Sequence, residues 1–557
     1  MSESEYTDAI PSLQKFNLAM PAAAAAPLSR RQLLASARNA GLLAVSAGGL
    51  GSLIAACGST AATSSASGGA GGAGGAAVRG GTLSAALTGN PSGMDPAVEN
   101  VYTGDEVYDN IFSKLIGMAP NGSFIPALAT KWTEQTPTEW VFDLVDNAVF
   151  HNGEKFGAKD VKYTFDRILD KSTGSPYVPN YSVIDGIEIV SPTRVIFHLK
   201  TPFGPFLTNL CQNAQIVNQK AIESSDPKLH PVGTGPFQFV SWVPNEKIVV
   251  KRAANYFQAG RPYLNGITFE FLPNEESRVQ ALEAGQLDWA DSVPLQALPT
   301  MKSSAAVRMV SSSAAGIPDI LSFNTSKPPF NNVALRQAIA WAIDRNEIVQ
   351  LAYFGTGAER GSQEVGPKSP WYGGDDPYAS APNLAMAKQK LREAGYPNGL
   401  TVEYLGLPQY PNLLTTGEVI QSQLKKIGIT MKITQLESIT WLDRYVKGDY
   451  QLTTAYWSGT VDPDNFYANL LLTGAGNNFS KYSNPQLDAL IQQARTQTAP
   501  AQRKATYESI RALVWEQVPV IFTAYETTTY VMSSHVSGST ITPTLELGFG
   551  QVWKTGQ

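Results

Sequence analysis

Residues 400–436 read LTVEYLGLPQYPNLLTTGEVIQSQLKKIGITMKITQL and contain the clearest structural pattern of the chain. The runs 400–406 and 429–436 are rich in β-branched and aromatic residues, which is typical of strands. Between them, 417–427 has the spacing of a helix. A strand, a helix and a strand in this order predict a β-α-β unit with parallel strands. The expected fold class is therefore α/β.

Two segments that follow predicted strands are candidates for a binding pocket, because ligands of parallel sheets sit at the carboxyl ends of strands. The first segment contains Gln409 and Tyr410 after the strand 400–406. The second follows the strand 451–456 and contains Trp457, Gly459 and Thr460, with Asp462 just beyond. Either aromatic ring can equally be a core residue.

The rest of the chain also mixes strands with helices. Strands are expected at 82–86, 140–144 and 195–199. Apolar residues at helical spacing predict helices over the segments 158–170, 332–352 and 383–394, and over a segment that begins after Asn484-Pro485. The alternation supports a mixed α/β architecture rather than an all-helical or all-β one.

Length and composition narrow the class of protein. A chain of 557 residues is too long for a single core, so two or more lobes are expected. Apolar residues make up 43% and charged residues 16%, which is ordinary for a globular protein. The formal net charge of −5 is spread along the chain, and no basic block predicts nucleic-acid binding. We expect Cys211 to be buried among apolar neighbours.

The N-terminal 57 residues have the organisation of an export signal. Arg30 and Arg31 precede an apolar stretch over 41–56 that is short for a membrane-spanning helix. The sequence Leu53-Ile54-Ala55-Ala56-Cys57 resembles a lipobox, so Cys57 is predicted to be lipidated and to anchor the protein. An ordinary signal peptide with an incidental Cys is the alternative. The paired arginines favour twin-arginine export over the general route, and Met20 is an alternative start to Met1.

The segment 58–78 reads GSTAATSSASGGAGGAGGAAV and has almost nothing to bury. Such a composition is typical of a flexible tether. A lipid anchor followed by a tether and a large body predicts an extracytoplasmic protein that acts close to a membrane surface.

Sequence motifs of catalysis and of metal or phosphate binding are missing. The four histidines are not within ligand spacing of one another, and no HExxH, CxxC, GxSxG or phosphate-binding glycine loop occurs. Asp462 and Asp464 could form a catalytic pair, but a turn or a helix N-terminus explains them more simply. We expect neither an enzyme nor a cofactor.

Several short segments, in a fixed order from about residue 80 to 540, give the body a family likeness. It resembles the family 5 extracellular solute-binding proteins of ABC importers, which include dipeptide- and oligopeptide-binding proteins. Each segment is weak alone, and their joint order carries the resemblance. The segments are ALATKW at 127–132, FHNGEKF at 150–156, AKDV at 158–161, PVGTGPF at 231–237, NYF at 255–257, AGQLD at 284–288, PF at 329–330, RQA at 336–338, AIDR at 342–345, EAGYP at 393–397 and DPDNF at 462–466.

The resemblance implies a two-lobe fold of the periplasmic-binding-protein type, with the solute enclosed between the lobes. It implies a first lobe over 79–316 with an extra subdomain at about 113–231, a second lobe over 317–522, and a return to the first lobe over 523–557. Crossing segments are expected near 311–317 and 522–528. The implied partners are a solute, a permease and its ATPase, with no nucleic acid, and we expect a monomer that closes on its ligand.

The resemblance is less informative about the solute. Dipeptide binders of the family hold the ligand's ammonium with an Asp where this chain has Thr460, and its carboxylate with an Arg that is absent from Leu407-Pro408-Gln409-Tyr410. Longer peptides, oligosaccharides or another polar solute remain open, as do a surface sensor, a chaperone and, less favoured, a surface hydrolase. Family position adds Met94, Asp95 and Tyr102 as pocket candidates of the first lobe.

Overall fold

The computed structural model describes residues 77–99, 102–379, 381–458 and 460–555, and those from Val78 onward belong to one compact unit. The predicted signal peptide with Arg30 and Arg31, the lipidation at Cys57, nearly all of the tract 58–78, and Gly459 lie outside the described residues.

The β-α-β unit predicted from residues 400–436 is confirmed. Strands β14 (Leu400–Gly406) and β15 (Ile429–Gln435) are parallel, with Leu400 opposite Ile429. The helix between them, α13 (Pro411–Lys425), begins six residues before its predicted start at 417. Pro411 stands at the first helical position, where its fixed φ and missing N–H cost nothing. On its other side β14 pairs in parallel with β16 (Leu452–Tyr456).

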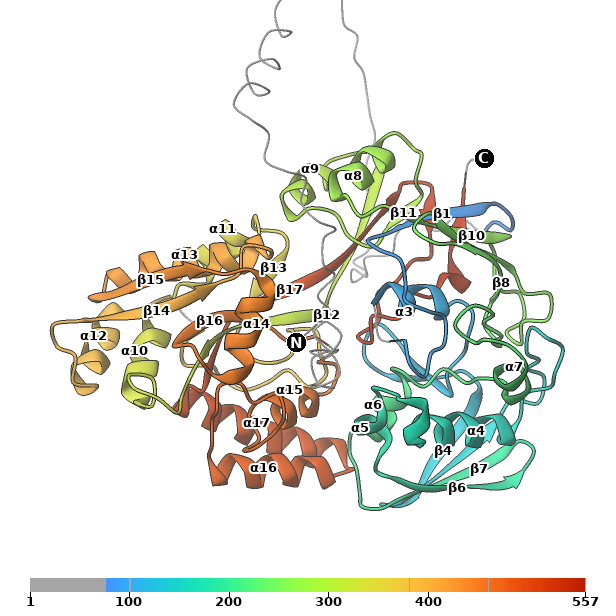
Figure 1. Cartoon of the computed structure of the whole chain (residues 1–557), viewed down its shortest axis with the longest axis horizontal. Coiled ribbons are helices and arrows are strands. Elements are labelled where there is room, and N and C mark those ends of the chain that lie inside the picture. Colours follow the sequence, from blue (N-terminus) through green and yellow to red (C-terminus); the bar gives the residue numbers. More distant parts are fainter. Residues whose placement is uncertain (1–76, 100–101, 380, 459, 556–557) are drawn as a thin grey trace, which may run out of the picture. The chain divides into compact units, whose positions relative to one another are not determined.

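Two long strands connect this part of the sheet to the rest (Figure 1). Strand β12 (Val307–Phe323) pairs antiparallel with β16 at one end and with β17 (Val520–Ser533) along most of its length. Strand β17 also pairs with β11 and β13. The sheet has the order β15-β14-β16-β12-β17-β11-β1-β10-β9-β8, with β13 beside β17. Its remaining strands are β1 (Thr82–Leu87), β8 (Phe237–Val243), β9 (Lys247–Arg252), β10 (Gly266–Phe271), β11 (Trp289–Ala290) and β13 (Ala358–Arg360).

A separate antiparallel sheet lies within the segment 113–231 that was predicted to be an extra subdomain. Its order is β4-β5-β7-β6, and α4 (Ala158–Leu169) packs against it through Val161, Phe165 and Ile168. Cys211 is fully buried in the same core, as expected. The bounds are β4 (Ala129–Thr136), β5 (Glu139–Leu144), β6 (Ile184–Ser191) and β7 (Arg194–Leu199), beside the hairpin β2 (Ile116–Met118) and β3 (Phe124–Pro126).

The single helix predicted over 332–352 is wrong. The chain forms α10 (Val333–Ala342) and α11 (Arg345–Ala352), separated at Asp344. Asp344 has an extended backbone, and its carboxylate accepts hydrogen bonds from the N–H groups of Asn346 and Glu347. This N-cap starts a new helix, because it satisfies amides that a continuous helix would bond to its own carbonyls.

The other helices surround the sheets (Figure 1). No helix among the described residues is long and apolar enough to cross a membrane. The helices are α3 (Tyr102–Tyr108), α5 (Val178–Tyr181), α6 (Phe206–Leu210), α7 (Gln219–Ser224), α8 (Glu275–Glu283), α9 (Leu298–Met301), α12 (Leu384–Glu393), α14 (Ser438–Lys447), α15 (Pro463–Leu470), α16 (Pro485–Thr496) and α17 (Pro500–Gln517). In the described part of the chain, short elements are β18 (Val536–Ser537), β19 (Trp553–Lys554) and the 3₁₀ turns at Lys171–Thr173, Leu295–Ala297 and Phe549–Gln551.

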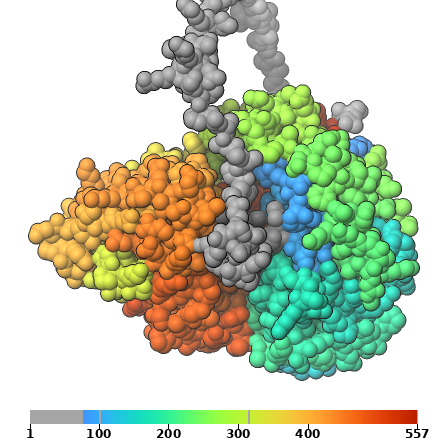
Figure 2. Space-filling model, viewed as in Figure 1, coloured from blue at the N-terminus to red at the C-terminus, as the bar shows by residue number. Residues whose placement is uncertain are grey.

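The end of α16 contacts the early part of the chain. The N–H of Gly204 donates to the carbonyl of Arg495 over 2.8 Å, and the Arg495 guanidinium lies 5.6 Å from the centre of the Phe203 ring. In Figure 2 the orange-red surface of the late helices adjoins the teal surface of the early segment. The chain therefore makes a second connection between these regions, besides β12 and β17.

Candidate functional site

Two tyrosines meet at the carboxyl ends of the parallel strands, where a pocket was predicted. Tyr410 follows β14 and Tyr456 ends β16, and their ring centroids lie 5.7 Å apart. Their hydroxyls are hydrogen-bonded, and both rings are partly exposed. Tyr410 was predicted as a pocket residue. Tyr456 was not, because only the residues after its strand were considered.

A buried carboxyl group lies beside these rings. Asp319, on β12, is 0% exposed, and its Oδ2 accepts a hydrogen bond from the Tyr353 hydroxyl. The Asn412 amide, at the start of α13, donates to the same hydroxyl over 3.4 Å. The other oxygen, Oδ1, has no hydrogen-bond partner among the described residues. A buried oxygen without a hydrogen-bond partner destabilises the folded state, and a donor group of a ligand could supply the missing hydrogen bond.

Glu526, on β17, is the second carboxyl group of this site. Asp319 is in register with Ala524, so Glu526 lies two residues along the neighbouring strand and on the same face of the sheet. Burial raises the pKa of Glu526 to about 7. The pKa of Asp319 is raised well above its usual range, first by burial and then by the nearby charge of Glu526.

A similar cluster lies further along β17. The hydroxyls of Tyr530 and of Tyr102, on α3, lie 3.2 Å apart. Glu106, one turn after Tyr102, is 1% exposed. Burial and then the charge of Asp291 raise the pKa of Glu106, whereas the Tyr102 hydroxyl lowers it. Tyr102, predicted from family position, thus stands among buried carboxyl groups.

The segment after β16 is fixed by internal hydrogen bonds. The indole N–H of Trp457 donates to Asn465 Oδ1 over 2.6 Å, and the Thr460 hydroxyl is 3.5 Å from the Trp457 carbonyl. Both side chains are buried. Thr460 carries no charge, so its side chain offers no counter-ion to an ammonium group of a ligand.

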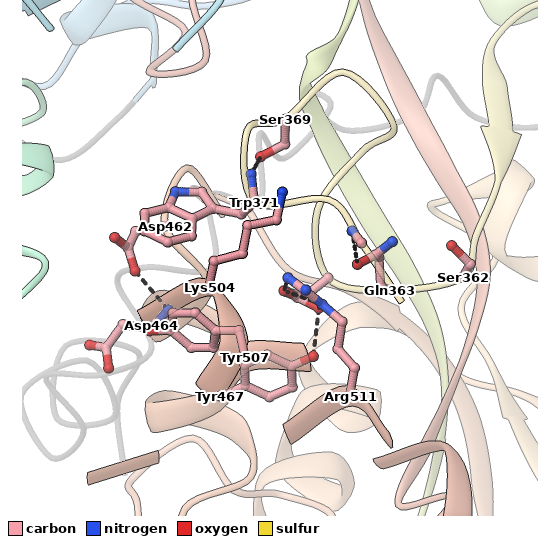
Figure 3. A network of polar contacts seen from close by, with 12 residues as sticks. Ser362, Gln363, Ser369, Trp371, Asp462, Asp464, Tyr467, Lys504, Tyr507 and Arg511 are labelled. Atoms are coloured by element: carbon pink, nitrogen blue, oxygen red, sulfur yellow. Dashed lines mark hydrogen bonds and ion pairs between the residues drawn. The ribbon is translucent and has the colours of Figure 1, made fainter. Parts of the chain in front are cut away.

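Asp462 has an interior role. Its carboxylate caps α15 by accepting from the N–H of Asp464 over 3.0 Å, and both of its oxygens accept from Arg503. The Arg503 guanidinium also donates to the Tyr507 hydroxyl and lies over the Trp371 ring. Figure 3 shows Asp462 and Tyr507 within this network. Asp462 therefore holds a helix and an arginine together.

A second buried ion pair lies in the same network (Figure 3). Arg511 and Glu364 approach to 2.6 Å, with side chains that are 1% and 0% exposed. The Tyr467 hydroxyl donates to Glu364 over 2.5 Å. Because Arg503 and Arg511 are both neutralised by carboxylates, neither offers a free charge to an anionic ligand.

The predicted residues Met94, Asp95 and Gln409 make local contacts. Met94 is fully buried in a hydrophobic core. Asp95 is 2% exposed and accepts from Arg167 through both oxygens, over 2.8 Å and 2.5 Å. Gln409 donates to Glu437 over 2.7 Å at the surface. Of the predicted residues, the structure brings Tyr410 next to the carboxyl pair, whereas Asp95 and Asp462 are engaged by arginines.

Sequence reasoning missed Asp319, Glu526 and Tyr353. A signal was present for the first two, because each is a single carboxylate inside a run that otherwise has strand character, IPDILSF and FTAYETTTYV. A charge in such a run is rarely buried without a reason. Among the described residues, no group of three or more His, Cys, Asp and Glu side chains could hold a metal ion.

The fold and the site together define a two-lobed solute-binding protein. The model of bacterial extracellular solute-binding proteins, family 5, matches residues 123–479, and the chain belongs to this family, the binding components of ABC importers. The resemblance found in the sequence and the α/β two-lobe fold are therefore confirmed.

Known relatives cover most of the chain. The dipeptide-binding protein of Escherichia coli K12 is 26% identical over 509 residues, which are 84% of this chain and 94% of that protein. The glutathione-binding protein GsiB of Pectobacterium atrosepticum is 26% identical over 470 residues, 81% of this chain and 90% of that protein. The periplasmic binding protein DppA of Helicobacter pylori, solved with the peptide STSA, superimposes with a TM-score of 0.71 at 26% identity, covering 86% and 98% of the two chains.

Proposed function

We propose that this solute-binding protein captures a peptide or a similar small polar solute outside the cytoplasm and delivers it to the permease and ATPase of an ABC importer. The observation that carries the proposal is the family match over residues 123–479. The ligand class is supported by relatives named for dipeptides and glutathione and by a solved relative that holds a tetrapeptide.

A dipeptide held by ions at both of its ends is not the solute we propose. Thr460 offers no charge, and the buried Arg503 and Arg511 are each paired with a carboxylate. Burying a zwitterion without paired charges costs several kcal/mol. A longer peptide held through its backbone, or another polar solute, suits the site better.

Capture proceeds by closure of the two lobes. Strands β12 and β17 are the segments that would bend, since they run from one part of the large sheet to the other. Ligand contacts made only in the closed form shift the equilibrium toward it by their differential affinity. No covalent chemistry is part of this cycle, and the protein is proposed to act as a binding protein without catalysis.

The protein is further proposed to be a monomer exported through the paired Arg30 and Arg31 and held at the membrane by acyl chains on Cys57. The Gly-, Ala- and Ser-rich tract 58–78 would then let the body reorient toward its permease.

A melting screen of the full chain in a mild detergent tests the function. Tripeptides, pentapeptides and oligosaccharides are added singly, and a ligand at 100 times its Kd stabilises the folded state by about 2.7 kcal/mol. A peptide that raises the Tm supports the proposal. If no solute raises it, and a chromogenic ester is hydrolysed by the protein but not by the Ser458→Ala variant, the binding function is wrong and a hydrolase replaces it.

A further inference from the structure

We propose that Asp319 and Glu526 form the recognition site for a positively charged group of the solute, an organic ammonium, at the carboxyl ends of β14 and β16. The inference rests on the proposed function and deepens it, because it specifies the chemical class of the ligand. The carboxylates come from β12 and β17, so the cation would be held by the two strands that cross the large sheet.

The first argument is the geometry of the two carboxyl groups. They lie on the same face of adjacent antiparallel strands, in a diagonal relationship. Burial raises the pKa of both groups, and the charge of Glu526 raises that of Asp319 further. Asp319 Oδ1 is buried and has no partner among the described residues. Tyr353 holds the other oxygen, which fixes the orientation of the carboxyl group. A ligand donor is the partner that this oxygen lacks.

The second argument is the absence of a protein cation from this site. Among the described residues, neither Asp319 nor Glu526 forms an ion pair. Arg360, on β13, is in register with Ala524, but its guanidinium is exposed and donates to the Ala379 carbonyl. A buried carboxylate without a counter-ion, such as that of Asp319, is stable only when it keeps a proton or receives a cation.

The third argument is access and the shape of the rim. Glu526, Tyr410, Tyr456 and Asn412 are partly exposed, whereas Asp319 is fully buried behind them. An ammonium group that enters past Glu526 meets one carboxylate at the rim and another in the interior. The two tyrosine rings offer aromatic faces that attract a cation, and the three N–H donors of a primary ammonium match several oxygens at once.

The acidic groups of the proposed site do not come from the segment after β16, which contains Thr460. Thr460, on the segment after β16, carries no charge. Here that segment is neutral, and the acidic groups stand instead on β12 and β17, across the ends of the same strands. The ammonium group of the solute would therefore lie against β12 and β17 rather than against the segment after β16.

Binding assays with matched probes test the inference. Isothermal titration of the full chain uses trilysine, trialanine, N-acetyl-trialanine amide, N-acetyl-triglutamate, spermidine and an equimolar tripeptide mixture. We expect probes with a free ammonium to bind and the acetylated or acidic probes to bind at least about 30-fold more weakly, the fold-change that corresponds to losing one buried charge contact.

Neutral variants of the same shape locate the cation. Asp319→Asn and Glu526→Gln mimic the protonated side chains and should fold, which the melting temperature without ligand verifies. Each variant should bind the ammonium probes about 30-fold more weakly, or weaker still, than the wild type does. Glu359→Gln is the matched control: Glu359 is on β13 in register with Tyr525 and so faces away from Glu526, and this variant should bind like the wild type.

Proton release gives an independent measurement. The groups around Glu526 are Asp319 on β12, Tyr456 on β16 and, on the same face of β13, Arg360. Tyr353 lies behind Asp319, and Tyr410 is hydrogen-bonded to Tyr456. A cation favours the ionised carboxylates, so binding should release protons at pH 6 and affinity should rise toward pH 8. Isothermal titrations in two buffers of different ionisation enthalpy give the number of protons that are released when the probe binds. The Glu526→Gln variant should release fewer protons than the wild type.

The outcomes separate the inference from the proposed function. If N-acetyl-triglutamate or N-acetyl-trialanine amide binds well and both variants bind it like the wild type, the ammonium site is wrong while the binding function stands. If ammonium probes bind without loss in either variant, the site is likewise wrong. If no probe and no component of the mixture binds, the proposed function fails together with the inference.

Discussion

The guanidinium of Arg503 donates to both carboxylate oxygens of Asp462, over 2.5 Å and 2.7 Å, and the two side chains are 2% and 4% exposed. An ion pair of this geometry satisfies both partners internally. Asp462 follows the segment after β16, and for that reason the sequence suggests a ligand-binding residue. In the structure, however, the charge of Asp462 is neutralised by Arg503.

Replacing Asp462 by Asn tests this relationship. Asn keeps the side-chain oxygen that caps α15 but leaves the Arg503 charge buried without a counter-ion, so the free energy of unfolding should fall by about 3–5 kcal/mol. Urea denaturation measures the loss. Asp375→Asn, at an exposed carboxylate, is the control and should change the stability by less than about 0.5 kcal/mol. A variant of normal stability that no longer binds the solute would contradict the structural role.

The second buried pair should behave in the same way. Glu364 accepts from both Arg511 and the Tyr467 hydroxyl, and it is 0% exposed. Glu364→Gln should lower the free energy of unfolding by about 3–5 kcal/mol because Arg511 then remains charged and unpaired. The exposed Glu283→Gln is the matched control, and denaturation in urea is again the measurement. An unchanged midpoint would mean that water reaches Arg511 in solution.

Part of the fold follows from the sequence because the local signals agree with the final packing. The strands β14 and β15 coincide with their predicted positions to within a residue, since their β-branched and aromatic runs are bounded by Gly399 and Gly428, both with positive φ. The break at Asp344 was missed although its signal was present: Asp344 and Glu347 have the spacing of a capping box, and the apolar stripe through both helices concealed it.

The candidate site is less predictable because its members are far apart in sequence. Asp319 and Glu526 become neighbours only through the pairing of β12 with β17, and Tyr353 reaches Asp319 from the end of α11. No local pattern contains such a juxtaposition. Tyr410 was found because the end of a parallel strand is a position that topology alone identifies.

The new helix start at Asp344 has an energetic consequence. Its carboxylate accepts from two N–H groups of α11, so Asp344→Ala should reduce the free energy of unfolding by about 1 kcal/mol. Asn346→Ala, at an exposed position of the same turn, should stay within about 0.5 kcal/mol of the wild type. Thermal and urea denaturation measure both variants. Equal stability of the two would show that the cap contributes nothing and that α11 is held by packing alone.

The pH dependence of stability should reflect the buried carboxyl groups near α3. Burial, and then the charge of Asp109, raise the pKa of Asp105 to about 8. In the unfolded chain an Asp has a pKa of about 3.9. Between these values the folded state keeps a proton that the unfolded state has lost, so the free energy of unfolding falls as the pH rises from about 4 to 8.

Urea denaturation at several pH values measures this slope. Asp105→Asn should make it shallower, because Asn does not titrate, and Asp185→Asn, at an exposed carboxylate, should leave it unchanged. A residual slope of the same sign is expected from Glu526, whose pKa is about 7. The prediction fails if the free energy of unfolding rises over this pH range, or if Asp105→Asn leaves the slope unchanged. Either result would mean that Asp105 is ionised in the folded protein.

Lipid attachment at Cys57 predicts where the protein is found in the cell. Each CH₂ group of an acyl chain contributes about 0.8 kcal/mol on insertion into a bilayer, so two or three chains hold the protein firmly without a spanning helix. Cys57→Ser should move the exported protein from the membrane to the soluble extracytoplasmic fraction and abolish incorporation of labelled palmitate. Ser59→Ala, two residues further on, should leave both unchanged. If the Cys57→Ser protein stays at the membrane without palmitate, its retention comes from an uncleaved signal segment, and Cys57 is then an incidental residue at the end of an ordinary apolar stretch.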